Sequence, residues 1–152
     1  AADAVEAMIS AIGTVTTESK SAIEEARAAY DALTDEQKAL VENYETLTTA
    51  ETALTKIEND IKAADDVEAM ISAIGTVTAE SKDAIEEARA AYDALTDEQK
   101  ALVENYETLT TAETTYSELT AEKELSFFEK LINWIVNAFN WVITLFQNIF
   151  SF

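Results

Sequence analysis

The sequence predicts an all-α protein: two tandem three-helix modules joined by a continuous helix, then a hydrophobic C-terminal helix with a narrow polar stripe. The first observation is composition, because the 152 residues include no proline and only two glycines, which favours helix almost everywhere. The second is a repeat with a period of 62 residues. The third is an apolar segment at residues 126–152, in which polar residues recur every three or four positions.

The repeat sets the expected domain boundaries. Residues 1–54 return at 63–116 with five differences, which are Ala4/Asp66, Thr17/Ala79, Ser21/Asp83, Ala53/Thr115 and Leu54/Tyr116. A fixed period of this kind indicates one structural unit used twice. We therefore expect helical modules at residues 1–62 and 63–125 and an assembly helix at residues 126–152. A bundle of about 60 residues buries a small core, so a helix shared by the two modules would stabilise both.

The first helix of each module is expected to be short. In the first copy, Val5, Met8, Ile9 and Ile12 are apolar at helical spacing. Gly13 follows them and predicts the end of this helix, because glycine adopts the left-handed cap conformation at low cost.

The second and third helices follow from capping residues and apolar spacing. The second is expected to begin at Thr16 or Thr17, and its apolar face consists of Ile23, Ala26, Ala29, Tyr30 and Leu33. The third begins with a capping box formed by Thr34 and Gln37. Its apolar positions are Leu40, Val41, Tyr44, Leu47, Ala50, Leu54, Ile57 and Ile61, and they continue as Ala64, Val67, Ile71 and Ile74. We therefore expect one rod across the repeat boundary, bent near Asn43–Tyr44.

Charge and composition argue against several functions. Thirty acidic and ten basic residues give a net charge of −20, and the bases form no stripe that could contact phosphates, so nucleic acid is not an expected partner. The chain has no histidine and no cysteine, which removes disulfides and the usual zinc ligands. Its carboxylates follow polar helix faces rather than the apolar pockets that shift a catalytic pKa. We expect no enzyme activity, cofactor, metal or small-molecule substrate.

Two further sets of residues are expected to be structural. Arg27 and its copy Arg89 are expected to pair with acids on their own helix, such as Glu24 and Asp31. The apolar spacing predicts core positions for four tyrosines, Tyr30, Tyr44, Tyr92 and Tyr106.

The stretches "VEAMISAIGTVT", "IEEARAAYDALTDEQKALVENY" and "LTTAE" occur in both copies and cover about residues 3–54 and 65–116. On these stretches the chain resembles the small helical modules repeated in cell-surface and secreted proteins of Gram-positive bacteria. It also resembles FIVAR modules in architecture, that is, in size and helix count. The resemblance implies a stalk or spacer outside the cell. It implies no ligand and no functional residue.

The C-terminal segment is read as a helix with two faces. Its polar stripe consists of Lys130, Asn133, Asn137, Asn140, Thr144, Gln147 and Ser151, at alternating spacings of three and four. The predicted assembly interface consists of Phe127, Phe128, Leu131, Trp134, Ile135, Ala138, Phe139, Trp141, Val142, Leu145, Phe146, Ile149, Phe150 and Phe152. Soluble surface helices carry a much narrower apolar stripe. We therefore expect this helix to pack against copies of itself or to enter a membrane.

The hypothesis favoured by the sequence is a non-enzymatic structural protein. It would assemble through residues 126–152 into a filament, tube or large homo-oligomer, with the acidic repeats as its outer coat or spacer. Its location would be secreted or on the cell surface after removal of a leader, because cleavage beside Ala1–Ala2 fits such processing. One alternative is a membrane-anchored or pore-forming protein that inserts the same helix into lipid, and a third hypothesis is an adhesin.

Overall fold

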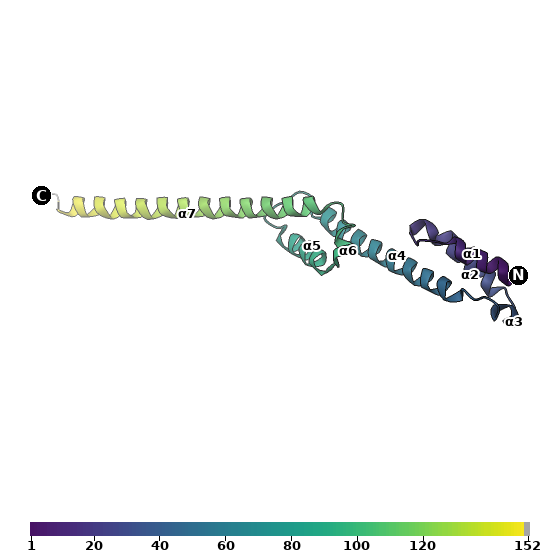
Figure 1. Ribbon diagram of the computed structural model, residues 1–152. Helices are drawn as coiled ribbons and strands as arrows, with labels where there is room; N and C mark the ends of the chain where they lie inside the picture. Colours follow the sequence, from purple (N-terminus) through teal and green to yellow (C-terminus); the bar gives the residue numbers. More distant parts are fainter. Residues whose placement is uncertain (151–152) are drawn as a thin grey trace. The chain divides into compact units, whose positions relative to one another are not determined.

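The computed structural model describes the backbone of residues 1–150 and the side chains of residues 1–146, and over this part of the chain it is all-helical, as predicted (Figure 1). The α-helices are α1 (Ala2–Ala11), α2 (Lys20–Asp31), α3 (Asp35–Lys38), α4 (Tyr44–Ala73), α5 (Lys82–Ala94), α6 (Asp97–Lys100) and α7 (Tyr106–Phe150). A 3-10 turn at Thr17–Ser19 precedes α2. No strand occurs within residues 1–150.

The chain divides into two compact units. Unit 1 contains residues 1–66 and 95–103, and unit 2 contains residues 67–94 and the chain from residue 104 onward. The helix α4 runs without a break through residues 62 and 63, so the expected rod across the repeat boundary is present. The module boundaries at residues 62 and 125 stay predictions.

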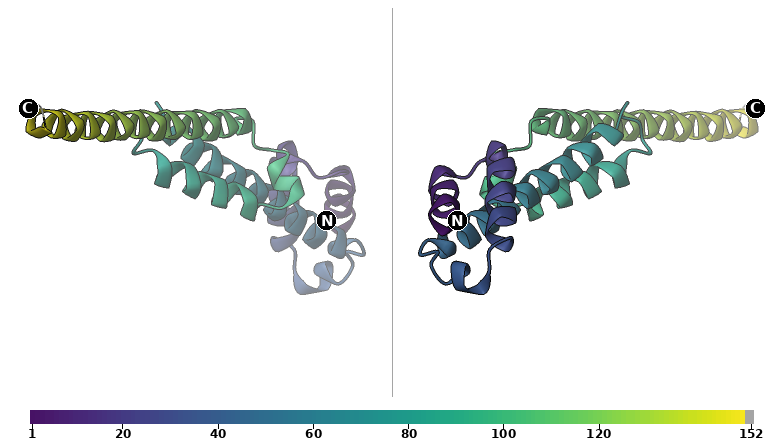
Figure 2. Two further views of the ribbon diagram at one scale, coloured as in Figure 1. Left: turned by 90° about the vertical axis from the view of Figure 1, so that its left-hand side faces the viewer. Right: turned by 90° about the vertical axis from the view of Figure 1, so that its right-hand side faces the viewer.

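Unit 1 is held by a small apolar core. Ile9 of α1 and Leu47 of α4 are fully buried, and Ile23 and Ala26 of α2 pack into the same cluster. Figure 2 shows α1 and α2 side by side, in agreement with their direct packing. Burial of one Ile or Leu side chain contributes about 1.5–3 kcal/mol. Because Ala26 and Ala50 supply little apolar area, a few larger side chains account for most of this core.

Unit 2 repeats this core 62 residues later. The positions equivalent to Ile9, Ile23, Ala26 and Leu47 are all buried in unit 2, and they are Ile71, Ile85, Ala88 and Leu109. The short helix α5 packs against the N-terminal part of α7. The apolar spacing of the sequence therefore predicted most of the buried positions in both copies.

Gly13 ends α1 as the sequence predicted. Its φ is +62°, and Gly75, its copy at the end of α4, has a φ of +57°. These values lie in the left-handed region that glycine adopts without steric cost. At each glycine the helix ends and the chain turns toward the next helix.

The third helix of the module differs from the prediction. The capping box is present, because Thr34 N donates to Gln37 Oε1 (3.1 Å) and Gln37 N donates to Thr34 Oγ1 (3.3 Å). However, α3 ends at Lys38 and α4 begins only at Tyr44, so the chain is interrupted rather than bent. Leu40, expected in the apolar face, lies in this interruption and is 65% exposed.

Contacts with α1 explain the interruption. Asn43 Nδ2 donates to the backbone oxygen of Glu6 (2.9 Å) and to Ser10 Oγ (3.1 Å), and Glu42 N donates to Glu6 Oε1 (2.7 Å). These bonds hold residues 42 and 43 against α1, and the bond from Glu42 N takes the place of a helical backbone bond. In unit 2, Asn105 makes the same pair of bonds with Glu68 and Ser72.

Candidate assembly surface on the C-terminal helix

The helix α7 has a packed part and an unpacked part. Leu109 and Ala112 are buried in unit 2, and Tyr116, Leu119 and Thr120 are half-buried. From Ala121 to Phe146 every side chain is exposed. The segment contains no proline or glycine and has many good helix formers, so the helix continues after its contacts with the rest of the chain have ended.

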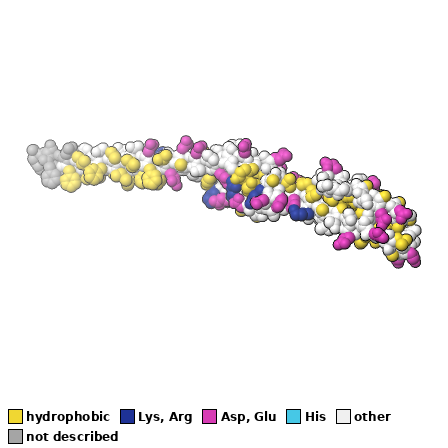
Figure 3. Space-filling view, viewed as in Figure 1, with side chains coloured by type: hydrophobic (Ala, Val, Ile, Leu, Met, Phe, Trp, Pro, Cys, Tyr) yellow, Lys and Arg dark blue, Asp and Glu magenta, His cyan; other side chains and the backbone are white. Residues whose placement is uncertain are grey.

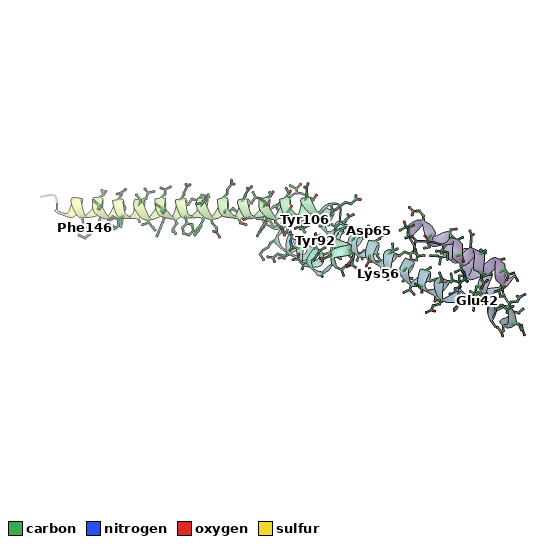
Figure 4. All side chains as sticks on the ribbon, in the orientation of Figure 1. Glu42, Lys56, Asp65, Tyr92, Tyr106 and Phe146 are labelled. Atoms are coloured by element: carbon green, nitrogen blue, oxygen red, sulfur yellow. The ribbon has the colours of Figure 1, made fainter. Side chains whose placement is uncertain are left out.

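The unpacked part carries a broad apolar surface. Residues along an α-helix are about 100° apart in projection, so the large apolar side chains between Leu125 and Phe146 cover an arc of about 220°. The exposed fraction ranges from 37% at Leu131 to 68% at Trp134 and Phe139. In Figure 3 hydrophobic side chains line one side of α7, and in Figure 4 Phe146 projects from that helix. We call this arc the assembly surface.

The predicted interface residues that the structure describes lie exposed on the assembly surface. They are Phe127, Phe128, Leu131, Trp134, Ile135, Ala138, Phe139, Trp141, Val142, Leu145 and Phe146. Phe127 and Phe128 also contact each other edge to face, with ring centroids 6.0 Å apart. Ile149, Phe150 and Phe152 lie outside the residues whose side chains are described.

Four exposed apolar residues were missed by the sequence prediction. Leu125, Ile132, Val136 and Ile143 are all more than 40% exposed. They form the border of the assembly surface opposite Trp134 and Trp141. Projection at about 100° per residue would have found them, because they share one face at spacings of seven, four and seven residues.

The polar stripe occupies the remaining arc. Lys130, Asn133, Asn137, Asn140 and Thr144 are exposed along it, whereas Gln147 and Ser151 lie beyond the described side chains. Thr144 Oγ1 donates to the backbone oxygen of Asn140 (2.9 Å), so this hydroxyl is bonded within its own helix. The side-chain amides of the stripe face solvent and require no partner inside an apolar contact.

The repeat allows the C-terminal part of α7 to be compared with the buried face of α4. Residues 126, 129, 133 and 136 follow residues 64, 67, 71 and 74 by one period of 62. The earlier positions are Ala64, Val67, Ile71 and Ile74, all buried. At the later positions stand Ser126, Glu129 and Asn133, with only Val136 apolar. Three of the four positions that are buried at the end of α4 and just after it are therefore polar in the C-terminal part of α7, and the fourth, Val136, lies on the border of the assembly surface.

In each unit, a cluster of one Arg, one Glu and two Tyr side chains links neighbouring helices. In unit 1, Arg27 on α2 donates from Nε and Nη2 to the two carboxylate oxygens of Glu51 on α4, each at 2.6 Å. Tyr30 and Tyr44 stack with ring centroids 4.3 Å apart, and the guanidinium of Arg27 lies over both rings. Arg27 lies 3.6 Å from Asp31, the neighbour on its own helix. The sequence prediction therefore missed its main partner, Glu51.

Unit 2 has the same cluster. Arg89 donates to Glu113 at 2.6 and 2.7 Å, and Tyr92 stacks on Tyr106 with centroids 4.4 Å apart (Figure 4). The prediction that the four tyrosines lie in the core holds only in part: Tyr30 is half-buried and packs against the core of unit 1, Tyr92 and Tyr106 are half-buried, and Tyr44 is 36% exposed. Their rings need a position at the edge of the core, where they can contact a guanidinium that stays partly hydrated.

In each Arg–Glu pair, the hydrogen bonds shift the pKa values in the direction that keeps both side chains charged. The hydrogen bonds from Arg27 lower the pKa of Glu51, and the same bonds raise the pKa of Arg27. Arg89 lowers the pKa of Glu113 in the same way. Both carboxylates are therefore held ionised and bonded, which suits a structural clamp between helices.

Other features offer little chemistry. Within the described residues, no group of three His, Cys, Asp or Glu side chains could hold a metal ion. A shallow depression of about 330 Å³ in unit 2 is lined by Ile74, Gly75, Val77, Glu107, Thr108, Thr111, Ala112 and Thr115. Glu107 is the only titratable group in that lining. Among the helices as far as the structure describes them, none has the length and apolar character needed to cross a membrane.

None of the family models, curated proteins or solved structures compared with the chain matches it.

Proposed function

We propose that the chain is a non-enzymatic structural protein that assembles with copies of itself through α7. The observation that carries this proposal is the assembly surface, on which large apolar side chains between Leu125 and Phe146 are exposed. Within the described residues, no other part of the same chain covers these side chains. The product would be a filament, tube or large homo-oligomer with the acidic units on its outside.

The free energy available from this surface is large. Each large apolar side chain moved out of water contributes about 1.5–3 kcal/mol. Fourteen such side chains between residues 125 and 146 are 37–68% exposed, so burial of nearly all of this exposed area gives on the order of 10–20 kcal/mol. An arc of about 220° is also wider than the apolar stripe of about 100° that a helix buries against one core. Several neighbours are therefore needed, which favours an assembly larger than a dimer.

Two observations favour copies of the chain over lipid. The polar stripe is amide and hydroxyl from Asn133 to Thr144, whereas helices that lie on membranes carry Lys and Arg along the polar face. The net charge of −20 also opposes approach to an anionic lipid surface. Membrane lipid remains the second candidate, because the assembly surface would be covered there as well.

The repeats would act as a spacer. We propose two three-helix modules, residues 1–62 and 63–125, that share α4 as a common helix, with the Arg–Glu clamps holding each module closed. An extracellular or cell-surface location follows only from the resemblance of the repeats to Gram-positive surface modules. The high negative charge would keep the outer parts of neighbouring copies apart and hydrated.

Deletion of residues 126–152 tests the proposal. The truncated chain should remain helical and sediment as a monomer, whereas the full chain should sediment as a large species in detergent-free buffer and show filaments or rings in electron microscopy. The same large species in the truncated chain would overturn the proposal. Flotation of the full chain with liposomes, together with a monomeric state in buffer, would favour lipid instead.

A further inference from the structure

We infer that neighbouring α7 helices pack antiparallel, in a register that places Ile135 of one copy beside Val142 of the next. This inference rests on the proposed self-assembly and adds the orientation and register of the partner. It is drawn from the distribution of charge along α7 and from the spacing of the assembly surface.

Charge is confined to one end of the helix. Residues 131–152 contain no charged residue, so the whole net charge of −20 lies in residues 1–130. The helix itself carries six acids before that point, against Lys123 and Lys130, and these acids are Glu107, Glu113, Glu118, Glu122, Glu124 and Glu129. A partner therefore meets a net negative surface at one end of α7 and an uncharged surface at the other.

Orientation decides whether these charges meet. Packed helices lie 8–10 Å apart, about one Debye length at physiological salt, so parallel copies would place acidic residues beside their own equivalents with little screening. In an antiparallel pair, the uncharged stretch 131–146 separates the charged ends by about 24 Å at 1.5 Å per residue. That distance is about three Debye lengths, so most of the repulsion is screened.

The spacing of the assembly surface accommodates an antiparallel copy, and separation of the charged ends favours a register centred on the uncharged stretch 131–146. Within the uncharged stretch 131–146, the residues nearest the centre of the arc are Leu131, Ile135, Ala138, Phe139, Val142 and Phe146. Their positions read the same in both directions about the midpoint between Ala138 and Phe139. A reversed copy therefore presents apolar side chains at the same levels, with Ile135 opposite Val142 and Leu131 opposite Phe146. The polar stripe of each copy then faces away from the contact.

Disulfide trapping tests the orientation. Because the sequence contains no cysteine, only the introduced cysteines can form a disulfide. We would prepare Ile135→Cys and Val142→Cys chains, one with a size tag, and oxidise each alone and after mixing. A disulfide needs Cα atoms within about 7 Å, and residues 135 and 142 are about 10.5 Å apart along a helix. The antiparallel register therefore predicts a mixed disulfide after mixing and at least about tenfold less dimer from either chain alone.

Asn137→Cys is the matched control, since it lies on the polar stripe and should form no disulfide with either partner. Disulfides between identical positions would show parallel packing and overturn the inference, while self-assembly would stand. A monomeric unmodified chain in sedimentation would overturn both.

Salt dependence of the unmodified chain gives a second measurement that needs no substitution. Between about 50 mM and about 500 mM salt, antiparallel tails predict less than about a threefold change in the dissociation constant. A tightening of about tenfold or more would instead indicate charged ends packed side by side and would contradict the inference.

Discussion

The guanidinium of Arg27 on α2 donates two hydrogen bonds to the carboxylate of Glu51 on α4, from Nε and from Nη2, both at 2.6 Å. The two residues are 24 positions apart, and the same geometry joins Arg89 to Glu113 in unit 2. The side chains of Arg27 and Glu51 are 27% and 32% exposed. The pair therefore clamps α2 to α4 at the edge of the core, where solvent screens it only in part.

We predict that this clamp stabilises unit 1. In a double-mutant cycle with Arg27→Met and Glu51→Gln, the coupling free energy measured by urea unfolding should be about 1–2 kcal/mol. Lys62 and Asp66 form an ion pair whose side chains are 72% and 66% exposed, so the equivalent cycle there should give about 0–0.5 kcal/mol. Equal couplings at the two sites would contradict the clamp.

Acid should weaken the protein through these carboxylates. The pKa of Glu51 is lowered below the ordinary value of 4.5 by Arg27, and that of Glu113 by Arg89. The unfolded chain therefore binds more protons between the folded pKa and pH 4.5, so this stability is present above pH 4.5 and is lost as the pH falls through the folded pKa. The measurement uses the Ile135→Lys chain, in which a charge on the assembly surface should prevent association. Its urea midpoint should decrease as the pH is lowered below about 4.5. The decline should be shallower when Glu51→Gln and Glu113→Gln are added.

Replacement of Gly13 should cost stability without a steric clash. A Cβ at this position would meet no atom within 4 Å, but the φ of +62° is unfavourable for an alanine. We expect Gly13→Ala to lower the free energy of unfolding by about 1 kcal/mol. Gly13→Asn should cost less, because asparagine tolerates the left-handed region. Equal stability of the glycine and alanine proteins in thermal unfolding would show that the turn can relax.

A charge placed on the assembly surface should block association. Ile135→Lys places an ammonium at the centre of the arc, and burial of an unpaired charge costs several kcal/mol. Asn137→Lys adds the same charge to the polar stripe two residues later and should leave association within about threefold of the unmodified chain. Sedimentation velocity compares the two. Loss of association in both variants would indicate that the stripe also lies inside the contact.

The prediction of helices succeeded where a local signal was sufficient. The apolar spacing gave the buried faces of α1, α2 and α5, the pair Thr34 and Gln37 gave the start of α3, and Gly13 gave the end of α1. The continuity of α4 followed from an apolar pattern that does not lapse at residue 62. Each of these features depends on residues within about two turns of one another.

Most of the candidate site could also be predicted from the sequence. The segregation of charge and the spacing of the polar stripe identify α7 as an unusual helix, and an isolated helix keeps the faces that its sequence gives it. The residues that were missed, such as Ile132 and Val136, lie on the border of the arc. The predicted interface was narrower than the apolar arc, although a helical projection of the sequence places these residues on it.

Only the tertiary structure decided which distant residues meet. Asn43 interrupts the third helix because the backbone of Glu6 and the hydroxyl of Ser10 lie beside it. Glu51 is the main partner of Arg27 because α4 returns alongside α2. The sequence by itself determined the helices, their apolar faces and the separation of a charged body from an uncharged apolar end, since these depend on local spacing and composition. Contacts between residues 20 or more positions apart depend on how the chain folds back, and no local pattern contains that information.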